Sequence, residues 1–271
     1  MSVPSTDVPV EPAGPDWASR RALVPGIFGS VAATYDATRP DYPPELFDAL
    51  ESVMGQPLLR ADVVDVGAGT GISSRALAGR GARVLAVDPS EGMLAVLRTR
   101  TSIVAAVRGR GEALPLRAGC MDLVAYAQSF HWADPGAAVP EAMRVLRPHG
   151  VLAAWWNISY AVDEAWCDAV EAALAAVDPT YSPDARAHDW AAVIRHVAGP
   201  DVPVARVEIP WTRVVPTRQW TQELRSHSNI AALGESVREQ LLTRISAVLT
   251  DAFVDGVARI PYRTRLFAVR R

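Results

Sequence analysis

The chain has 271 residues, 49% of them hydrophobic, which is enough for a substantial core in one domain with inserted or appended segments. Its 27 basic residues, all of them arginine, and its 30 acidic residues give a formal charge of -3, which argues against a basic nucleic-acid-binding surface. The lack of lysine in the sequence excludes a Schiff base or a lysine general base. The 2 cysteines are too few for a disulfide framework and are expected to be reduced, as in a cytoplasmic protein.

The N-terminal part of the chain is rich in Pro, Ser and Asp. We expect residues 1–26 to form a disordered tail, since they contain no apolar core of a signal peptide or membrane helix. No later stretch is long enough and free enough of charge to span a bilayer. Residues 27–45 follow as a separate segment that contains the pattern Tyr-x-x-x-Arg-Pro-x-Tyr, with its first tyrosine at Tyr35 and its arginine at Arg39.

The first predicted strand ends in a glycine-rich turn. The run Val63–Gly71 carries Asp65 in the strand and glycines at positions 67, 69 and 71, before a helix that starts at Ile72. Glycines let the backbone turn sharply and let a ligand approach closely. A dinucleotide fingerprint needs a glycine or alanine where this chain has Ile72, and Asp65 would repel a pyrophosphate. The spacing therefore favours a ligand that presents a cation.

Two further segments place polar residues directly after a short strand. One predicted strand ends at Asp88, near the ~20-residue offset at which ribose-binding acids follow a glycine-rich loop, and Pro89 comes next. The alternative for Asp88 is a helix N-cap, and the alternative for Met93 in the following helix is a core position. The third segment, Gly109–Leu116, reads Gly-Arg-Gly-Glu-Ala-Leu-Pro-Leu.

The fourth predicted strand covers residues 122–128 and is followed by Ser-Phe-His-Trp, then by a helix that ends in Arg-Val-Leu-Arg-Pro. In this order the segments resemble the class I S-adenosylmethionine-dependent methyltransferases over residues 28–157. The resemblance implies a doubly wound, Rossmann-like α/β sheet of seven strands with an antiparallel edge strand, and S-adenosylmethionine as the cofactor. The spacing of His, Cys and acidic residues does not indicate a metal site.

The resemblance implies roles for individual residues. The glycine-rich loop would wrap the methionine half of the cofactor with Asp65 near its amino group, and Asp88 would accept hydrogen bonds from both ribose hydroxyls. Arg39 would pair with the cofactor carboxylate, because a guanidinium binds a carboxylate in a bidentate manner. Arg110 stands where relatives often have an Asp that receives the adenine amino group. The expected cofactor residues are Tyr35, Arg39, Asp65, Gly67, Ala68, Gly69, Gly71, Asp88, Pro89, Met93, Glu112, Ala113 and Gln128.

Two histidines are candidates for catalysis. His131, just past the fourth strand, is the first candidate for a general base, with Trp132 as a wall of the pocket; the alternative is a packing role for His131. The segment Leu-Arg-Ser-His-Ser, which ends at Ser228, resembles Leu-Arg-Thr-Trp-Ser of trans-aconitate methyltransferase-like enzymes, which methylate small-molecule carboxylates. There His227 is the second candidate, and Arg225 or Ser228 would hold an acceptor carboxylate. The alternative for Arg225 is a solvated surface position.

Helices around 158–200 and 217–250 are expected to cap the carboxyl ends of the strands, where open α/β sheets bind ligands. Residues 27–271 would then form one methyltransferase domain with a lid at 27–45. Trp156 and Tyr160 are the aromatic residues expected to reach the substrate, while most others are expected in the core.

The last two predicted strands, residues 204–215 and 262–269, are expected to form a hairpin at one edge of the sheet. Pro210 lies inside the first of them and cannot donate a hydrogen bond to a neighbouring strand. An edge or bulged position is therefore expected for this strand.

Three hypotheses for function stay open. The first is a cytoplasmic methyltransferase of a small molecule or modified peptide, in which a carboxylate oxygen accepts the methyl group by in-line displacement and needs no base. The second is a phenol or amine methyltransferase with His131 as general base. The third is a cofactor-binding protein without catalysis. The expected partner is a small molecule or peptide rather than nucleic acid or a membrane, and the sequence predicts no oligomeric state.

Overall fold

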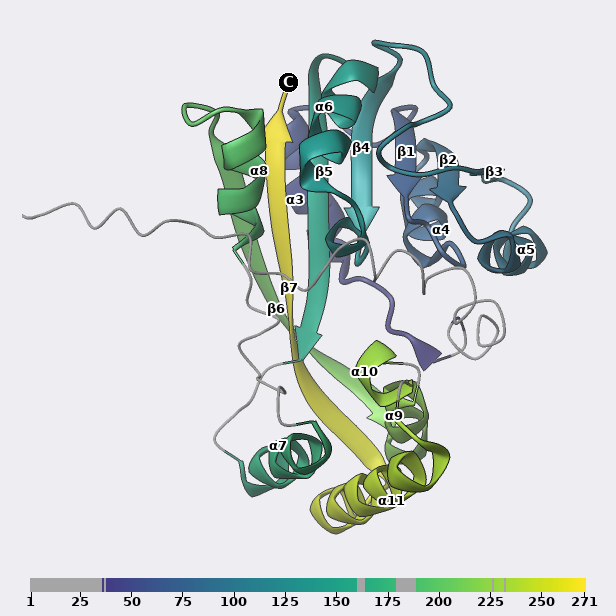
Figure 1. The fold of residues 1–271 in the computed structure, drawn as a ribbon, viewed down its shortest axis with the longest axis vertical. Helices are drawn as coiled ribbons and strands as arrows, with labels where there is room; N and C mark the ends of the chain where they lie inside the picture. Colours follow the sequence, from purple (N-terminus) through teal and green to yellow (C-terminus); the bar gives the residue numbers. More distant parts are fainter. Residues whose placement is uncertain (1–35, 37, 160–163, 179–188, 226, 232) are drawn as a thin grey trace, which may run out of the picture.

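The computed structural model describes residues 36, 38–159, 164–178, 189–225, 227–231 and 233–271 (Figure 1). Within these ranges the chain forms a seven-stranded sheet in the order β3-β2-β1-β4-β5-β7-β6. Its strands are β1 (Asp62–Val66), β2 (Arg83–Asp88), β3 (Ala105–Arg108), β4 (Met121–Ala127), β5 (Leu146–Ser159), β6 (Val204–Pro216) and β7 (Val257–Arg270). This is the predicted Rossmann-like arrangement.

The strand directions also agree with the sequence. Strands β1 to β5 are parallel, and β7 is antiparallel to both β5 and β6. The final two strands therefore form the predicted antiparallel pair at one edge of the sheet. Strand β6 is the edge strand and has a neighbouring strand on one side only, where Pro210 pairs with Arg263. Proline lacks an N–H group, and an edge strand tolerates this.

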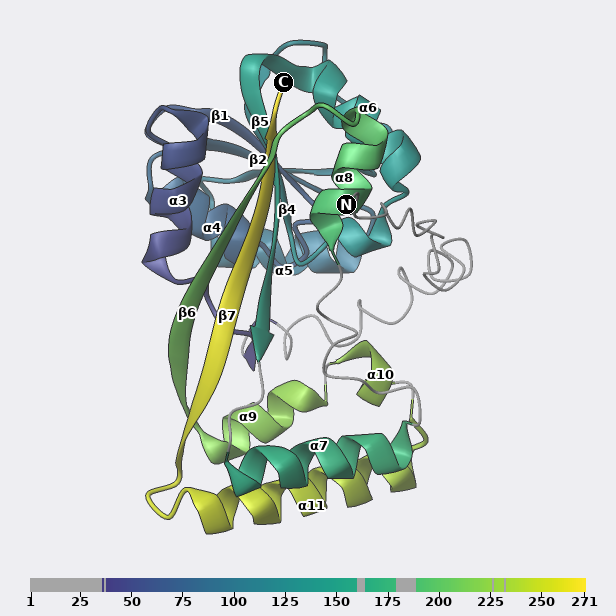
Figure 2. The same ribbon diagram turned by 90° about the vertical axis from the view of Figure 1, so that its left-hand side faces the viewer.

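Helices cover both faces of the sheet, because consecutive residues of each buried strand point to opposite sides. Trp155 of β5 joins the core under helices α3 (Pro44–Met54), α4 (Ile72–Gly79) and α5 (Glu91–Arg100). Its neighbour Trp156 joins the core under α6 (Pro135–Val145) and α8 (Trp190–Ala198) on the other face. Figure 2 shows the two helical layers on either side of the sheet.

A helical unit lies beyond the carboxyl end of β5 (Figure 1). It consists of α7 (Ala165–Val177), α9 (Thr217–Leu224), α10 (Ser228–Ala231) and α11 (Glu235–Ala252). These helices share a buried cluster with the far ends of β6 and β7, which contains Leu174, Trp220, Ile245 and Tyr262. Helix α8 differs from the expectation for residues 158–200, because its apolar face packs with α6 on the sheet. None of the helices in the described ranges has the length and apolar character to cross a bilayer.

A buried ion pair joins the helical unit to the sheet. Arg213 of β6 donates to the carboxylate of Glu223 in α9, and to the backbone oxygen of Thr38 at 2.6 Å. Arg213 is 8% exposed and Glu223 2% exposed. Burial acts to raise the pKa of Glu223, but the neighbouring His227 and the charge of Arg213 hold it below its usual range. Glu223 therefore stays ionised inside the protein.

We expect Arg213→Met to lower the free energy of unfolding by about 3–5 kcal/mol, because it leaves the Glu223 carboxylate buried without its cation. Arg225→Met is the matched control, since it removes a half-exposed partner of Glu239, and its expected effect is below about 1 kcal/mol. Urea denaturation of the full chain measures both. Equal losses in the two variants would contradict a structural role for the buried pair.

Candidate functional site

The loop after β1 makes a sharp turn beneath the end of β4. Gly67 has a φ of 68°, and a Cβ atom there would lie 2.5 Å from the Cβ of Ser129. Gly69 has a φ of 57°, and no atom of the described residues lies within 4 Å of a Cβ position there. Gly67 is therefore required for packing, while Gly69 borders open space that a ligand can enter.

Asp65 is a buried acid directly before this loop. It has no exposed surface, and the Ser74 hydroxyl donates to its Oδ2 at 2.6 Å. Its Oδ1 has no hydrogen-bond partner among the described residues. Burial, and to a smaller extent the charge of Asp88, raise the pKa of Asp65 to about 7. Such an orphaned acceptor suits a cationic or hydrogen-bond-donating group of a ligand.

Asp88 lies at the end of β2 beside the glycine loop. Its Oδ2 accepts from the backbone nitrogen of Gly69 and its Oδ1 from that of Ser90, both at 2.8 Å. Burial raises the pKa of Asp88, and these two backbone donors oppose the shift. Each carboxylate oxygen keeps a further lone pair, so the group can accept from a diol. Met93, in the helix that follows, is buried.

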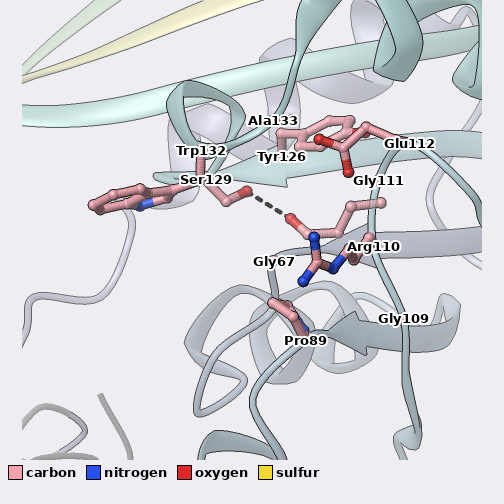
Figure 3. A pocket seen from close by; sticks show the side chains of 11 residues that line it. Gly67, Pro89, Gly109, Arg110, Gly111, Glu112, Tyr126, Ser129, Trp132 and Ala133 are labelled. Carbon is pink, nitrogen blue, oxygen red and sulfur yellow. Dashed lines mark hydrogen bonds between the residues drawn. The ribbon is translucent and has the colours of Figure 1, made fainter. Parts of the chain in front are cut away.

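A pocket of about 550 Å³, partly open to solvent, lies at the carboxyl ends of β1, β2 and β4. Figure 3 shows Gly67, Pro89, Arg110, Glu112, Ser129 and Trp132 around it. The pocket thus lies between three parts of the chain: the loops after β1 and β2, the loop after β3, and the end of β4. Because these segments are far apart in sequence, the pocket is a product of the parallel sheet.

The loop after β3 contributes one charge of each sign to the pocket. Figure 3 shows the Arg110 guanidinium pointing from this loop towards Gly67 and Pro89. The Oε1 of Glu112 accepts from the backbone nitrogen of Asp134 at 2.9 Å, which ties the loop to the start of α6.

Ala113, an expected cofactor residue, does not line the pocket. It is exposed and forms an isolated bridge with Arg110, and Gly111 lines the pocket instead. A Cβ atom at Gly111 would lie 2.5 Å from the hydroxyl oxygen of Tyr126, so only a glycine fits there.

The end of β4 supplies a contact that sequence reasoning missed. The Ser129 hydroxyl donates to the backbone oxygen of Val66 at 2.5 Å, so the ends of β4 and β1 are joined at the pocket. The sequence pattern that could have identified Ser129 is a polar residue shortly after an apolar strand, the same pattern that identified Asp88. Gln128, in contrast, donates to the backbone oxygen of Asn157 at 3.1 Å and ties β4 to β5. It is not among the residues that line the pocket.

His131 lies in the short 3-10 helix η1 (Phe130–Trp132), next to the pocket residue Trp132. The indole nitrogen of Trp156 donates to the Nδ1 of His131 at 3.1 Å. Trp156 is 8% exposed and stacks on Trp190 with a centroid distance of 5.2 Å and an angle of 9°. Trp156 is thus a buried support for His131.

The second group of expected residues lies in the helical unit. Arg225 donates through both terminal nitrogens to Glu239 of α11, at 2.5 and 2.9 Å, so it fastens α9 to α11. The Nε2 of His227 lies 3.8 Å from the Oε1 of Glu223 and belongs to the buried cluster with Arg213. Ser228 is the first residue of α10. The structure therefore places these residues apart from the pocket beside β1 and β4.

Two expected residues, Tyr35 and Tyr160, lie outside the described residues. Arg39 is half-buried in the segment that precedes α3. This segment is held at three points: Asp36 pairs with Arg75 and Arg100, the backbone oxygen of Thr38 accepts from Arg213, and that of Asp41 accepts from Asn157 at 3.2 Å.

Comparisons with known proteins find methyltransferases. Residues 64–154 match the sequence family described as "Methyltransferase domain". An uncharacterized methyltransferase of Mycobacterium tuberculosis is 45% identical over 130 residues, which cover 48% of this chain and 51% of the relative. A malonyl-[acyl-carrier protein] O-methyltransferase of Serratia marcescens is 36% identical over 140 residues, which cover 49% of this chain and 51% of that protein. The chain thus spans about half the length of the curated relatives it matches.

Solved structures share the fold. A provisionally assigned type II methyltransferase of Anaeromyxobacter dehalogenans matches with a TM-score of 0.61 at 24% identity, covering 86% of this chain and 97% of the other. A methyltransferase of Anabaena variabilis, provisionally assigned to an antibiotic biosynthesis pathway, matches with a TM-score of 0.58 at 19% identity, covering 84% and 98%.

We expect the contribution of Asp65 to stability to fall as pH rises from about 4 to 7, because Asp65 has a pKa of about 7 when folded and its ordinary value of 3.8 when unfolded. The folded state then holds a proton that the unfolded state has lost. Asp65→Asn removes this effect and should be more stable than the native chain at pH 8 by about 2–4 kcal/mol. Urea denaturation across this pH range measures it, with the exposed Glu91→Gln as control. An Asp65→Asn variant that is less stable at pH 8 would contradict the assignment.

Proposed function

We propose that the chain is a class I S-adenosylmethionine-dependent methyltransferase that methylates a small molecule or a modified peptide, with a carboxylate oxygen as the acceptor. The match of residues 64–154 to the family described as "Methyltransferase domain" supports this proposal. The observation that carries the cofactor part is the Asp88 carboxylate, which accepts from Gly69 at the entrance of an open glycine loop. A cytoplasmic location belongs to the same proposal, since neither Cys120 nor Cys167 forms a disulfide bond.

The residues around the pocket fit S-adenosylmethionine. Asp88 would hold the ribose hydroxyls with its remaining lone pairs, and Pro89 and Glu112 border the space for the base. Asp65 would attract the amino group of the methionine part, because its Oδ1 has no partner among the described residues. When bound, the cofactor supplies a methyl group on a positively charged sulfur. The chain has to align an acceptor with that methyl group and exclude water.

Two segments would enclose the acceptor. The helical unit of α7, α9, α10 and α11 lies beyond the strand ends, and we assign it to the cap. The part of the 27–45 segment that the structure describes is tied by Asp36 and Thr38 to the core and to Arg213, as a closed lid requires.

A carboxylate is favoured as acceptor on chemical grounds. It is ionised at neutral pH and needs no general base, whereas a phenol or an amine has to lose a proton. The similarity to a protein named malonyl-[acyl-carrier protein] O-methyltransferase supports the same class. The second candidate, a phenol or amine methyltransferase, is favoured only by the place of His131 next to the pocket residue Trp132.

We expect Asp88→Ala to weaken the binding of S-adenosylhomocysteine by about 2–4 kcal/mol, or about 30-fold or more in Kd, because a charge-assisted pair of hydrogen bonds is lost. Titration calorimetry on the full chain measures this. Glu91→Ala, an exposed acid three positions further on, is the control and should leave Kd within about twofold. An unchanged affinity of Asp88→Ala would rule out its role.

We expect the native chain to transfer labelled methyl from S-adenosylmethionine to members of a panel of small carboxylic acids. An ester product releases labelled methanol in mild alkali, whereas a phenol ether or a methylamine does not, so one treatment separates the acceptor classes. Asp88→Ala serves as the background reaction. Label found only in alkali-stable products would support a phenol or amine methyltransferase. Tight cofactor binding without transfer to any acid, phenol or amine would support a protein that only binds the cofactor.

A further inference from the structure

The indole of Trp156 determines which nitrogen of the His131 ring carries the proton. An indole N–H can only donate, so the Nδ1 that receives it from Trp156 must carry a lone pair. In a neutral imidazole the proton then lies on Nε2. The hydrogen bond at 3.1 Å therefore selects the Nε2–H tautomer.

The indole that makes this selection is held in place. Trp156 is 8% exposed, stacks on Trp190 at 5.2 Å, and meets the ring of Phe267 edge-on at 6.0 Å. Rotating Trp156 to break the hydrogen bond would disturb this buried cluster. The Nδ1 of His131 is thus engaged for as long as the end of β5 is folded.

We infer that His131 binds the methyl acceptor as a hydrogen-bond donor through Nε2–H and does not serve as its general base. This inference rests on the proposed function and deepens it. His131 is half-buried, one residue before Trp132, which lines the pocket, and two after Ser129, which closes it against β1. Its ring is 5.0 Å from that of Trp132, so the His131 side chain adjoins the pocket wall through Trp132.

The proton position restricts the class of acceptor. An Nε2–H donates to a lone pair and has no site for a proton taken from a phenol or an ammonium group. An ionised carboxylate fits, because its oxygen already carries the electron pair that forms the new oxygen–carbon bond. The pair of the broken sulfur–carbon bond stays on sulfur, the charges of donor and acceptor cancel, and no proton moves. The acceptor class is therefore an oxygen that is anionic at neutral pH, such as a carboxylate.

The tautomer is measured directly, without any reaction. In nitrogen-15 NMR of the full chain, the proton on the His131 ring is expected on Nε2, with Nδ1 carrying the lone pair. Trp156→Phe keeps an aromatic ring but removes the donor, so the same spectrum should move towards a mixture of both tautomers. A native spectrum with the proton on Nδ1, or one that Trp156→Phe leaves unchanged, would overturn the inference.

The role is measured with paired variants. His131→Gln supplies an amide N–H in place of Nε2–H, whereas His131→Leu supplies none. With a carboxylate acceptor we expect KM to rise about tenfold to hundredfold in His131→Leu, and Gln to recover most of that loss, with a rate that is flat between about pH 6 and 9. A general base would instead lower kcat equally in both variants, and would make the native rate fall at low pH.

The two tests separate this inference from the proposed function. Absence of methyl transfer to any carboxylate would remove the proposed acceptor, and the NMR result would still decide the tautomer. If the native chain methylates carboxylates but His131→Gln loses this activity as fully as His131→Leu, the donor role of His131 is overturned and the proposed function stands.

Discussion

The arrangement of the site depends on the close contact between the loop after β1 and the end of β4. The Ser129 hydroxyl reaches the backbone oxygen of Val66 at 2.5 Å, and Gly67 leaves no space for a side chain between them. In a parallel sheet the carboxyl ends of strands meet at one edge, and this contact fixes how far apart two of them lie. Asp88 at the end of β2, for which we propose a contact with the nucleoside, and His131 after β4, for which we propose a contact with the acceptor, are both positioned relative to this contact.

The buried acid Asp65 lowers the stability of the fold at a place where it can bind a ligand. Asp65 has no exposed surface and a pKa raised to about 7 by burial, so its charged form destabilises the fold. Nothing in the packing requires a carboxylate there, because the Ser74 hydroxyl could equally donate to an amide oxygen. A destabilising acid next to an open glycine loop is therefore best explained by a ligand that carries a positive charge.

The sequence predicted those parts of the site that depend on local signals. An apolar strand that ends in an acid or in glycines identified Asp65, Asp88 and the loop at Gly67, and the structure brings all three to one place. The pocket residues Ser129 and Gly111 depend on pairs of distant residues, and their close contacts with Gly67 and Tyr126 have no local signal. The place of α8 was missed for a similar reason, since its partner α6 is far away in the chain.

The two histidines that sequence reasoning considered together have different surroundings. His227 faces Glu223, a carboxylate that Arg213 already holds ionised in a buried cluster. His131 is held in one tautomer by a neutral indole, and its proton is on Nε2. His227 thus belongs to the buried cluster of Glu223 and Arg213, whereas His131 presents an N–H group next to the pocket residue Trp132. A ring nitrogen that donates and offers no lone pair suits an acceptor that is already anionic, which is why the proposed acceptor is a carboxylate and not a phenol or an amine.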